Sequence, residues 1–148
     1  MSFVRRTRTR IVIAAGPTEV WSALCDLPRY ARWNPVLSLR PWRGESLRAG
    51  RRAWLSLKLF GVPLVVPVLV EVAEPAREIR WVGGPWGLLR GRHYFELHAD
   101  GEATELVHGE HFEGLLLPLM WPLMEGELDR LYRSINEGLA AYVERQAP

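Results

Sequence analysis

The sequence predicts an α+β fold: a curved antiparallel sheet of about seven strands packs on one long C-terminal helix, with two short helices between the first two strands. Three observations predict it. An apolar stripe at helical spacing runs through residues 114–146. Short strand-like segments, separated by Gly and Pro turn signals, fill the middle of the chain. One strand precedes the two short helices, which argues against a repeated βαβ array.

The long helix is predicted from apolar residues in steps of three and four, with charged residues on the opposite face. Because proline is tolerated in a first turn but not deeper in a helix, regular helix is predicted to begin near Pro122. Residues 114–121 are then a hydrophobic approach segment, which either gates a cavity or is plain core. The stripe comprises Leu117, Met120, Met124, Leu128, Leu131, Ile135, Leu139 and Tyr142.

The first elements are a strand and two short helices. Residues 8–14, RTRIVIA, are short and β-branched, which predicts the strand. Gly16 and Pro17 break it and open a helix, since proline suits an early helical position. A second short helix over residues 28–33 is stopped at Asn34-Pro35, because a residue before proline avoids the helical region.

The middle of the chain predicts four strands, over residues 36–39, 51–60, 64–73 and 78–82. An Arg- and Gly-rich loop follows the first of them. Pro67 cannot donate to a strand ladder, so it predicts an edge or bulge position for its strand.

The last hairpin pairs residues 91–98 with residues 104–112 around an Asp-Gly turn. A two- or four-residue loop places odd positions of the first strand on the same face as even positions of the second. The reverse face, predicted to meet solvent, holds Arg92, Tyr94, Glu96, Glu105, His111 and Glu113. The inner face holds His93, Phe95, Leu97, Leu106, His108, Glu110 and Phe112.

Length and composition fit an ordinary globular domain, which we expect to span residues 1–148. Residues 1–58 hold 12 Lys or Arg against 3 Asp or Glu, but no nucleic-acid motif accompanies them, so we expect no nucleic-acid partner. Residues 115–124 are too short for a membrane span, and we expect no stable membrane insertion. Cys25 alone excludes an internal disulfide, and the N-terminus lacks a signal-peptide pattern; we expect a cytoplasmic monomer or homodimer.

Four patterns, in this order, resemble the SRPBCC superfamily, the START-like or birch-pollen-allergen-like helix-grip fold, and its polyketide cyclase/dehydrase and lipid-transport families. They are residues 11–21, 26–35, 91–97 and 104–114, and the resemblance covers about residues 8–145. It implies an elongated apolar cavity, and a group that binds lipids, hormones or polyketides with only some members acting as enzymes. It carries no universal catalytic signature, so no residue inherits a catalytic role.

His93, His108 and Glu110 are the candidate catalytic residues, because two imidazoles and a carboxylate on neighbouring strands can exchange protons. Three interpretations of these residues remain open. They form a buried network whose polar groups are all hydrogen-bonded or which orients a ligand, they act as a catalytic acid and base, or they bind a metal ion. The spacing matches no dedicated metal motif, and we expect neither a metal nor a cofactor.

The leading hypothesis is binding, and possible transport, of a hydrophobic small molecule such as a lipid, polyketide or aromatic metabolite between the sheet and the C-terminal helix. The alternatives are a cyclase/dehydrase-like or hydrolase-like enzyme, and a stress-response or interaction module with a filled interior. Trp86 and Trp121 are expected at the cavity mouth. The full set of expected ligand contacts is Leu55, Leu57, Val66, Val68, Trp81, Trp86, His93, Phe95, Leu97, Leu106, His108, Glu110, Phe112, Met120, Trp121, Met124 and Leu128.

Overall fold

The computed structural model describes residues 3–42 and 47–146. Part of the predicted Arg- and Gly-rich loop, and both ends of the domain expected over residues 1–148, lie outside them. In chain order the elements are β1 Phe3–Ile13, α1 Pro17–Cys25, the 3₁₀ helix η1 Leu27–Arg32, β2 Leu37–Pro41, β3 Arg52–Leu59, β4 Val62–Glu74, β5 Glu78–Gly83, β6 Arg90–Asp100, β7 Ala103–Gly114 and α2 Leu117–Gln146.

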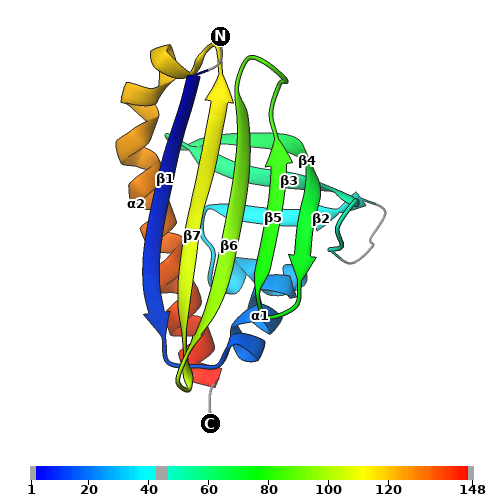
Figure 1. Cartoon of the computed structure of the whole chain (residues 1–148), viewed down its shortest axis with the longest axis vertical. Helices are drawn as coiled ribbons and strands as arrows, with labels where there is room; N and C mark the ends of the chain where they lie inside the picture. The colour runs from blue at the N-terminus through cyan, green and yellow to red at the C-terminus, as the bar shows by residue number, and fades with distance from the viewer. Residues whose placement is uncertain (1–2, 43–46, 147–148) are drawn as a thin grey trace.

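Seven strands form one antiparallel sheet in the order β1-β7-β6-β5-β4-β3-β2. The sheet curls, so that β2 and β3 cross behind the plane of β6 and β5, while α2 runs behind β1 and β7 (Figure 1). The α+β helix-grip prediction is therefore confirmed, including the two short helical segments between β1 and β2. No helix in the described ranges is long and apolar enough to cross a membrane.

The start of α2 differs from the prediction. The helix begins at Leu117 and contains Pro122, so the expectation that regular helix begins near Pro122 was wrong. Leu117 is fully buried and Trp121 nearly so, whereas Pro122 is exposed. Burial of the two large apolar side chains offsets the hydrogen bond that the proline cannot make.

Pro67 occupies a local edge inside an interior strand. β4 lies between β5 and β3, so the strand as a whole is not at the edge of the sheet. Its pairing with β5 begins only at Val68, however, and Pro67 pairs with β3 alone. The missing N–H therefore falls where β5 has ended, which is where proline is tolerated. The β4 register shift lies further along, between Val70 and Val72.

The last hairpin has the predicted parity. Asp100 pairs with Ala103, which leaves a two-residue turn, and His93 pairs with Glu110 on the inner face. The expectation that the reverse face meets solvent was wrong for Tyr94, which is 6% exposed. Its ring lies over Gly109, where a Cβ would collide with it, and beneath the guanidinium of Arg80 at 5.3 Å.

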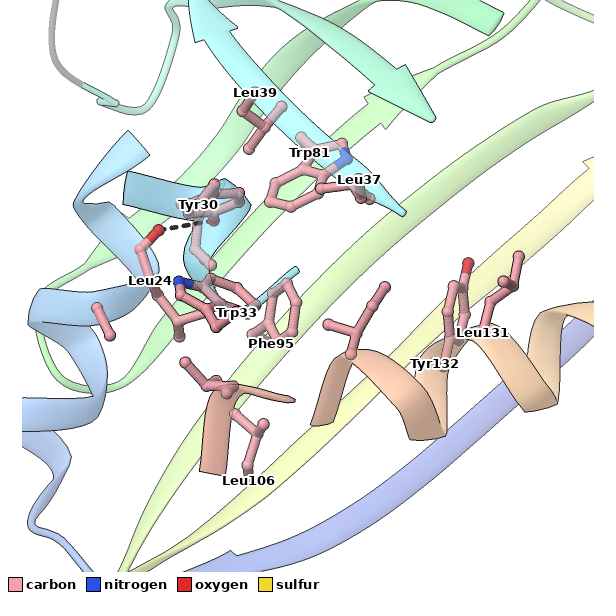
Figure 2. Close-up of a cluster of buried hydrophobic side chains, with 14 of the residues drawn as sticks. Leu24, Tyr30, Trp33, Leu37, Leu39, Trp81, Phe95, Leu106, Leu131 and Tyr132 are labelled. Atoms are coloured by element: carbon pink, nitrogen blue, oxygen red, sulfur yellow. Dashed lines mark hydrogen bonds between the residues drawn. The ribbon is translucent and has the colours of Figure 1, made fainter. Parts of the chain in front are cut away.

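At the end of the sheet drawn lowest in Figure 1, α1 and η1 cover the interior. Tyr30 donates a hydrogen bond to the carbonyl oxygen of Leu24 at 2.6 Å, and its ring packs on Trp33. Figure 2 shows these residues close to Phe95 and the inner side of the sheet. This end of the interior is therefore filled with side chains, and any hollow must lie further towards the start of α2.

Candidate functional site

An apolar cavity of about 240 Å³ lies between the curled sheet and α2. Its walls come mainly from β3, β4, the β5–β6 connection and the inner stripe of α2. The lining residues are Val36, Leu37, Leu55, Leu57, Leu59, Val66, Val68, Trp81, Gly83, Gly84, Pro85, Leu89, Gly91, His93, Glu110, Phe112, Met124, Leu128, Leu131, Tyr132 and Ile135. Cavities that are mostly apolar with a few convergent polar groups are typical ligand sites.

The polar groups of the cavity meet at one place. Glu110 of β7 faces His93 of β6, with 3.3 Å between Glu110 Oε1 and His93 Nδ1. Tyr132, which projects from α2 with its hydroxyl pointing away from the helix (Figure 2), donates a hydrogen bond to the same Oε1. The cavity therefore has one polar spot, contributed by two neighbouring strands and the helix that crosses them.

A chain of buried hydrogen bonds supports this spot from behind. His93 Nε2 lies 2.7 Å from His108 Nε2, and His108 Nδ1 lies 2.7 Å from the side-chain oxygen of Asn136. The amide nitrogen of Asn136 donates to the hydroxyl of Thr9, which donates to the backbone oxygen of His108. The relay thus joins β1, β7, α2 and β6, and each of its buried polar groups is satisfied.

The donors and acceptors of the relay fix where its protons lie. Thr9 uses its hydroxyl hydrogen on a backbone oxygen, so it must accept from the Asn136 amide, whose oxygen then faces His108. His108 Nδ1 therefore carries a hydrogen. Burial, and secondarily the charge of His93, lower the pKa of His108 well below its usual range, so this imidazole is neutral and its Nε2 accepts.

The position of the next proton is fixed between His93 and Glu110. Since His108 Nε2 accepts, His93 Nε2 must donate to it. A neutral His93 would then present a lone pair at Nδ1 to the carboxylate oxygen 3.3 Å away, which is repulsive unless a proton lies between them. His93 and Glu110 therefore share one proton. The pair is neutral overall whether that proton resides on the imidazole or on Oε1.

The second oxygen of Glu110 is free to contact a ligand. Oε1 receives both Tyr132 and His93, while Oε2 makes none of the hydrogen bonds found in residues 3–42 and 47–146. Gly91 gives it room, because a Cβ at this position would collide with Oε2. Burial raises the pKa of Tyr132 well above its usual range, so its hydroxyl stays protonated and keeps donating to Oε1.

Ten of the residues expected to contact a ligand line this cavity. They are Leu55, Leu57, Val66, Val68, Trp81, His93, Glu110, Phe112, Met124 and Leu128. Four others lie deeper in the core, beyond the lining: Phe95, Leu97, Leu106 and His108. His108 is fully buried and acts on the cavity only through His93.

The two tryptophans expected at the cavity mouth are not among the residues that line the cavity. Trp86 is 76% exposed, with the Arg90 guanidinium 4.4 Å from its ring centroid. Trp121 is buried against Phe112, with ring centroids 5.7 Å apart. Neither contributes to the cavity lining, and neither does Met120, which packs at the edge of the core.

Sequence reasoning missed Tyr132, Asn136 and Thr9. Tyr132 and Asn136 are four residues apart and therefore lie on one face of α2, beside the apolar stripe. That spacing of two polar-tipped residues is the only sequence signal for them. Thr9 gives no such signal, because its partner is set by the pairing of β1 with β7.

The site shows no arrangement suited to a metal ion. Across the described residues, no group of three or more His, Cys, Asp or Glu side chains could hold one. His93 and His108 direct their Nε2 atoms at each other instead of at a common point.

A curled antiparallel sheet that grips a C-terminal helix around an apolar cavity defines the START-like, or SRPBCC, class of proteins. Residues 4–144 match the sequence model of the family described as polyketide cyclase/dehydrase and lipid transport, and the chain belongs to that family. No curated protein matches the sequence.

Solved structures share the fold at low sequence identity. The Zhui aromatase/cyclase from Streptomyces sp. R1128 is similar with a TM-score of 0.78 and 16% identity, over 97% of this chain and 96% of that one. A START superfamily protein from Mycobacterium smegmatis gives 0.75 and 17%, over 96% and 99%. A norcoclaurine synthase mutant from Thalictrum flavum, bound to a transition-state analogue, gives 0.75 and 8%, over 99% of both chains.

Proposed function

We propose that this protein binds a hydrophobic small molecule in the cavity between the sheet and α2. The observation that supports this proposal most directly is the cavity itself, about 240 Å³ with an almost wholly apolar wall. Apolar surface facing an unfilled space gains free energy when a ligand covers it. A purely structural interior, as in the interaction-module hypothesis, has no need of such a space.

The proposal is tested by filling the cavity. Leu57→Trp places an indole where the cavity lies, whereas Leu123→Trp adds the same group to an exposed position of α2 that is not part of the lining. Binding of an apolar naphthalene-type probe, measured by fluorescence titration, should be lost in the first variant and unchanged in the second. Equal binding by both variants would place the probe outside the cavity and refute the proposal.

Acid–base catalysis of the cyclase or dehydrase type is the second candidate. Glu110 lines the cavity, its Oε2 makes no hydrogen bond within the described residues, and its Oε1 shares a proton with His93. The name of the family, and the aromatase/cyclase with the same fold, favour this chemistry. In such a step Glu110 would take a proton from a carbon beside a carbonyl group, which leaves an enolate, and would return that proton to the oxygen or a carbon of the enolate.

The same geometry gives a reason to rank catalysis second. An enolate oxygen needs an accessible hydrogen-bond donor, and no described polar group of the cavity offers one. The Tyr132 hydroxyl donates to Glu110, both His93 nitrogens are engaged, and the Trp81 N–H, although unpaired, is buried. Deuterium exchange into the methyl group of 2-acetylnaphthalene in D₂O, followed by NMR, tests the point. Exchange that requires Glu110, and stops in Glu110→Gln, would reverse the ranking.

Transport, cytoplasmic location and oligomeric state extend the proposal. We infer a cytoplasmic carrier, active as a monomer or homodimer. Transfer of a bound probe from the loaded protein to acceptor vesicles would support transport, and its retention would favour storage or sensing. Light scattering on the purified protein would give the number of chains.

A further inference from the structure

We propose that the ligand of this cavity is an uncharged hydrophobic molecule with a hydroxyl group, phenolic or alcoholic, that donates its hydrogen to Glu110 Oε2. This inference rests on the proposed function and specifies the chemistry of the same site. It follows from three features of the polar spot: what it accepts, what it cannot donate, and its net charge.

The polar spot offers acceptors. The proton shared by Glu110 and His93 lies between Oε1 and Nδ1, so Oε2 carries no hydrogen in either placement of that proton. With the proton on the imidazole, Oε2 belongs to a carboxylate; with the proton on Oε1, it is a carbonyl oxygen. Both are acceptors. The Tyr132 oxygen, whose hydrogen is given to Glu110, likewise has only lone pairs left.

The polar spot has no donor to give. A ligand whose polar group only accepts, such as an ether, ester or ketone, would therefore leave Oε2 unpaired and bury its own oxygen unpaired as well. Each buried polar group without a partner costs free energy comparable with a lost hydrogen bond. A hydroxyl group satisfies Oε2 and keeps its own donor paired.

The polar spot is neutral, which disfavours charged ligands of either sign. Glu110 and His93 carry zero net charge together, and no Lys, Arg or Asp is among the described residues that line the cavity. A carboxylate or phosphate would enter without a cation, and an ammonium group without an unpaired anion. Burying an unpaired charge is far more costly than burying a hydroxyl group.

Gly91 shows that Oε2 is held in place. A Cβ at residue 91 would occupy the position of this oxygen, so the carboxyl group lies directly on the backbone of β6. The opposite oxygen is fixed by Tyr132 from α2 and by His93 from β6. The acceptor is therefore positioned before any ligand arrives, which lowers the entropic cost of binding.

A matched set of probes on the unmodified protein tests the inference. 2-Naphthol, 2-methoxynaphthalene, 2-naphthoate and 2-naphthylmethylamine share one ring system and differ in the polar group, which at pH 7 is respectively a neutral donor, a neutral acceptor, an anion and a cation. Isothermal titration should show 2-naphthol binding about tenfold or more tightly than each of the others, the factor expected for one buried hydrogen bond to a charged or polarised group.

Glu110→Leu provides the sharper arm of the experiment. Leucine removes Oε2 and leaves the hydroxyl hydrogen of Tyr132 without its acceptor, so the preference should shift from 2-naphthol towards 2-methoxynaphthalene. Glu113→Leu, on the reverse face of the same strand, should keep the preference of the unmodified protein.

The outcomes separate the two proposals. If 2-methoxynaphthalene or either charged probe binds as tightly as 2-naphthol, the cavity binds ligands but the inference about the hydroxyl group is wrong. If none of the four probes binds, the proposed function fails and the inference fails with it.

Discussion

Replacing Asn136 by leucine tests the relay behind the cavity. The side chain is 2% exposed and makes two hydrogen bonds of 2.7 Å, one with His108 and one with Thr9. Leucine has nearly the same shape but no polar atoms. The variant therefore leaves the His108 Nδ1–H without an acceptor, while Thr9 keeps its bond to a backbone oxygen.

The expected loss of unfolding free energy is that of one buried donor left without an acceptor. One buried donor left unpaired costs about 1–3 kcal/mol of unfolding free energy. For a chain of this size, each kcal/mol lowers the melting temperature by roughly 2–4 °C. Urea unfolding followed by tryptophan fluorescence should register the loss as a lower midpoint with an unchanged slope.

A double-mutant cycle with His108→Phe shows whether the loss arises from this bond. In the phenylalanine background there is no N–H to orphan, so Asn136→Leu should cost at least about 1 kcal/mol less than in the unmodified protein. The same cost in both backgrounds would refute the assignment of protons along the relay. ¹⁵N NMR of the unmodified protein provides an independent check, because it should find the hydrogen of His108 on Nδ1.

Three further predictions concern pH, the Glu110 position and the helix. His108 stays neutral in the folded protein, whereas in the unfolded chain it takes up a proton below about pH 6.5. The unfolding free energy should therefore fall as the pH drops below that value, by up to about 1.4 kcal/mol per pH unit. Urea unfolding from pH 7.5 to 5 should show a shallower fall in His108→Phe, and equal slopes in the two proteins would contradict the account. Gly91→Ala should weaken 2-naphthol binding about tenfold by displacing Glu110, whereas Gly126→Ala, whose Cβ meets open space, should not; unchanged titrations of Gly91→Ala would count against a fixed Oε2. Pro122→Ala should raise the unfolding free energy by up to about 3 kcal/mol in thermal or urea unfolding by restoring a helical hydrogen bond, and a lower stability would show that the proline is favourable there.

Much of the architecture was predictable because it depends on local periodicity. The two-residue step of strands and the Asp-Gly turn placed His93 and Glu110 on one face, and the two-residue loop found at Asp100 maintains that parity. The stripe of α2 was predicted for the same reason, with Met120 the one member that is only partly buried. Periodicity determines which face of an element is inside.

It does not determine which part of that face is hollow. Phe95 and Leu106 share the inner face with Glu110, but both are fully buried in the packed core, whereas Glu110 lines the cavity. That difference depends on the curl of the sheet and on where α1 and η1 cover it. Tyr132 and Asn136 were missed for a related reason, because the height at which α2 crosses the sheet is set by tertiary packing.

The most direct test of the account is to locate a bound probe by NMR. In protein with ¹³C-labelled Leu and Val methyl groups, nuclear Overhauser contacts from the ring protons of 2-naphthol are expected to the methyl groups of Leu57, Val66 and Leu128, which line the cavity. Contacts only to the exposed methyl groups of Leu119 and Leu123, which are 76% and 71% accessible, would place the ligand on the outside of α2 and contradict the account.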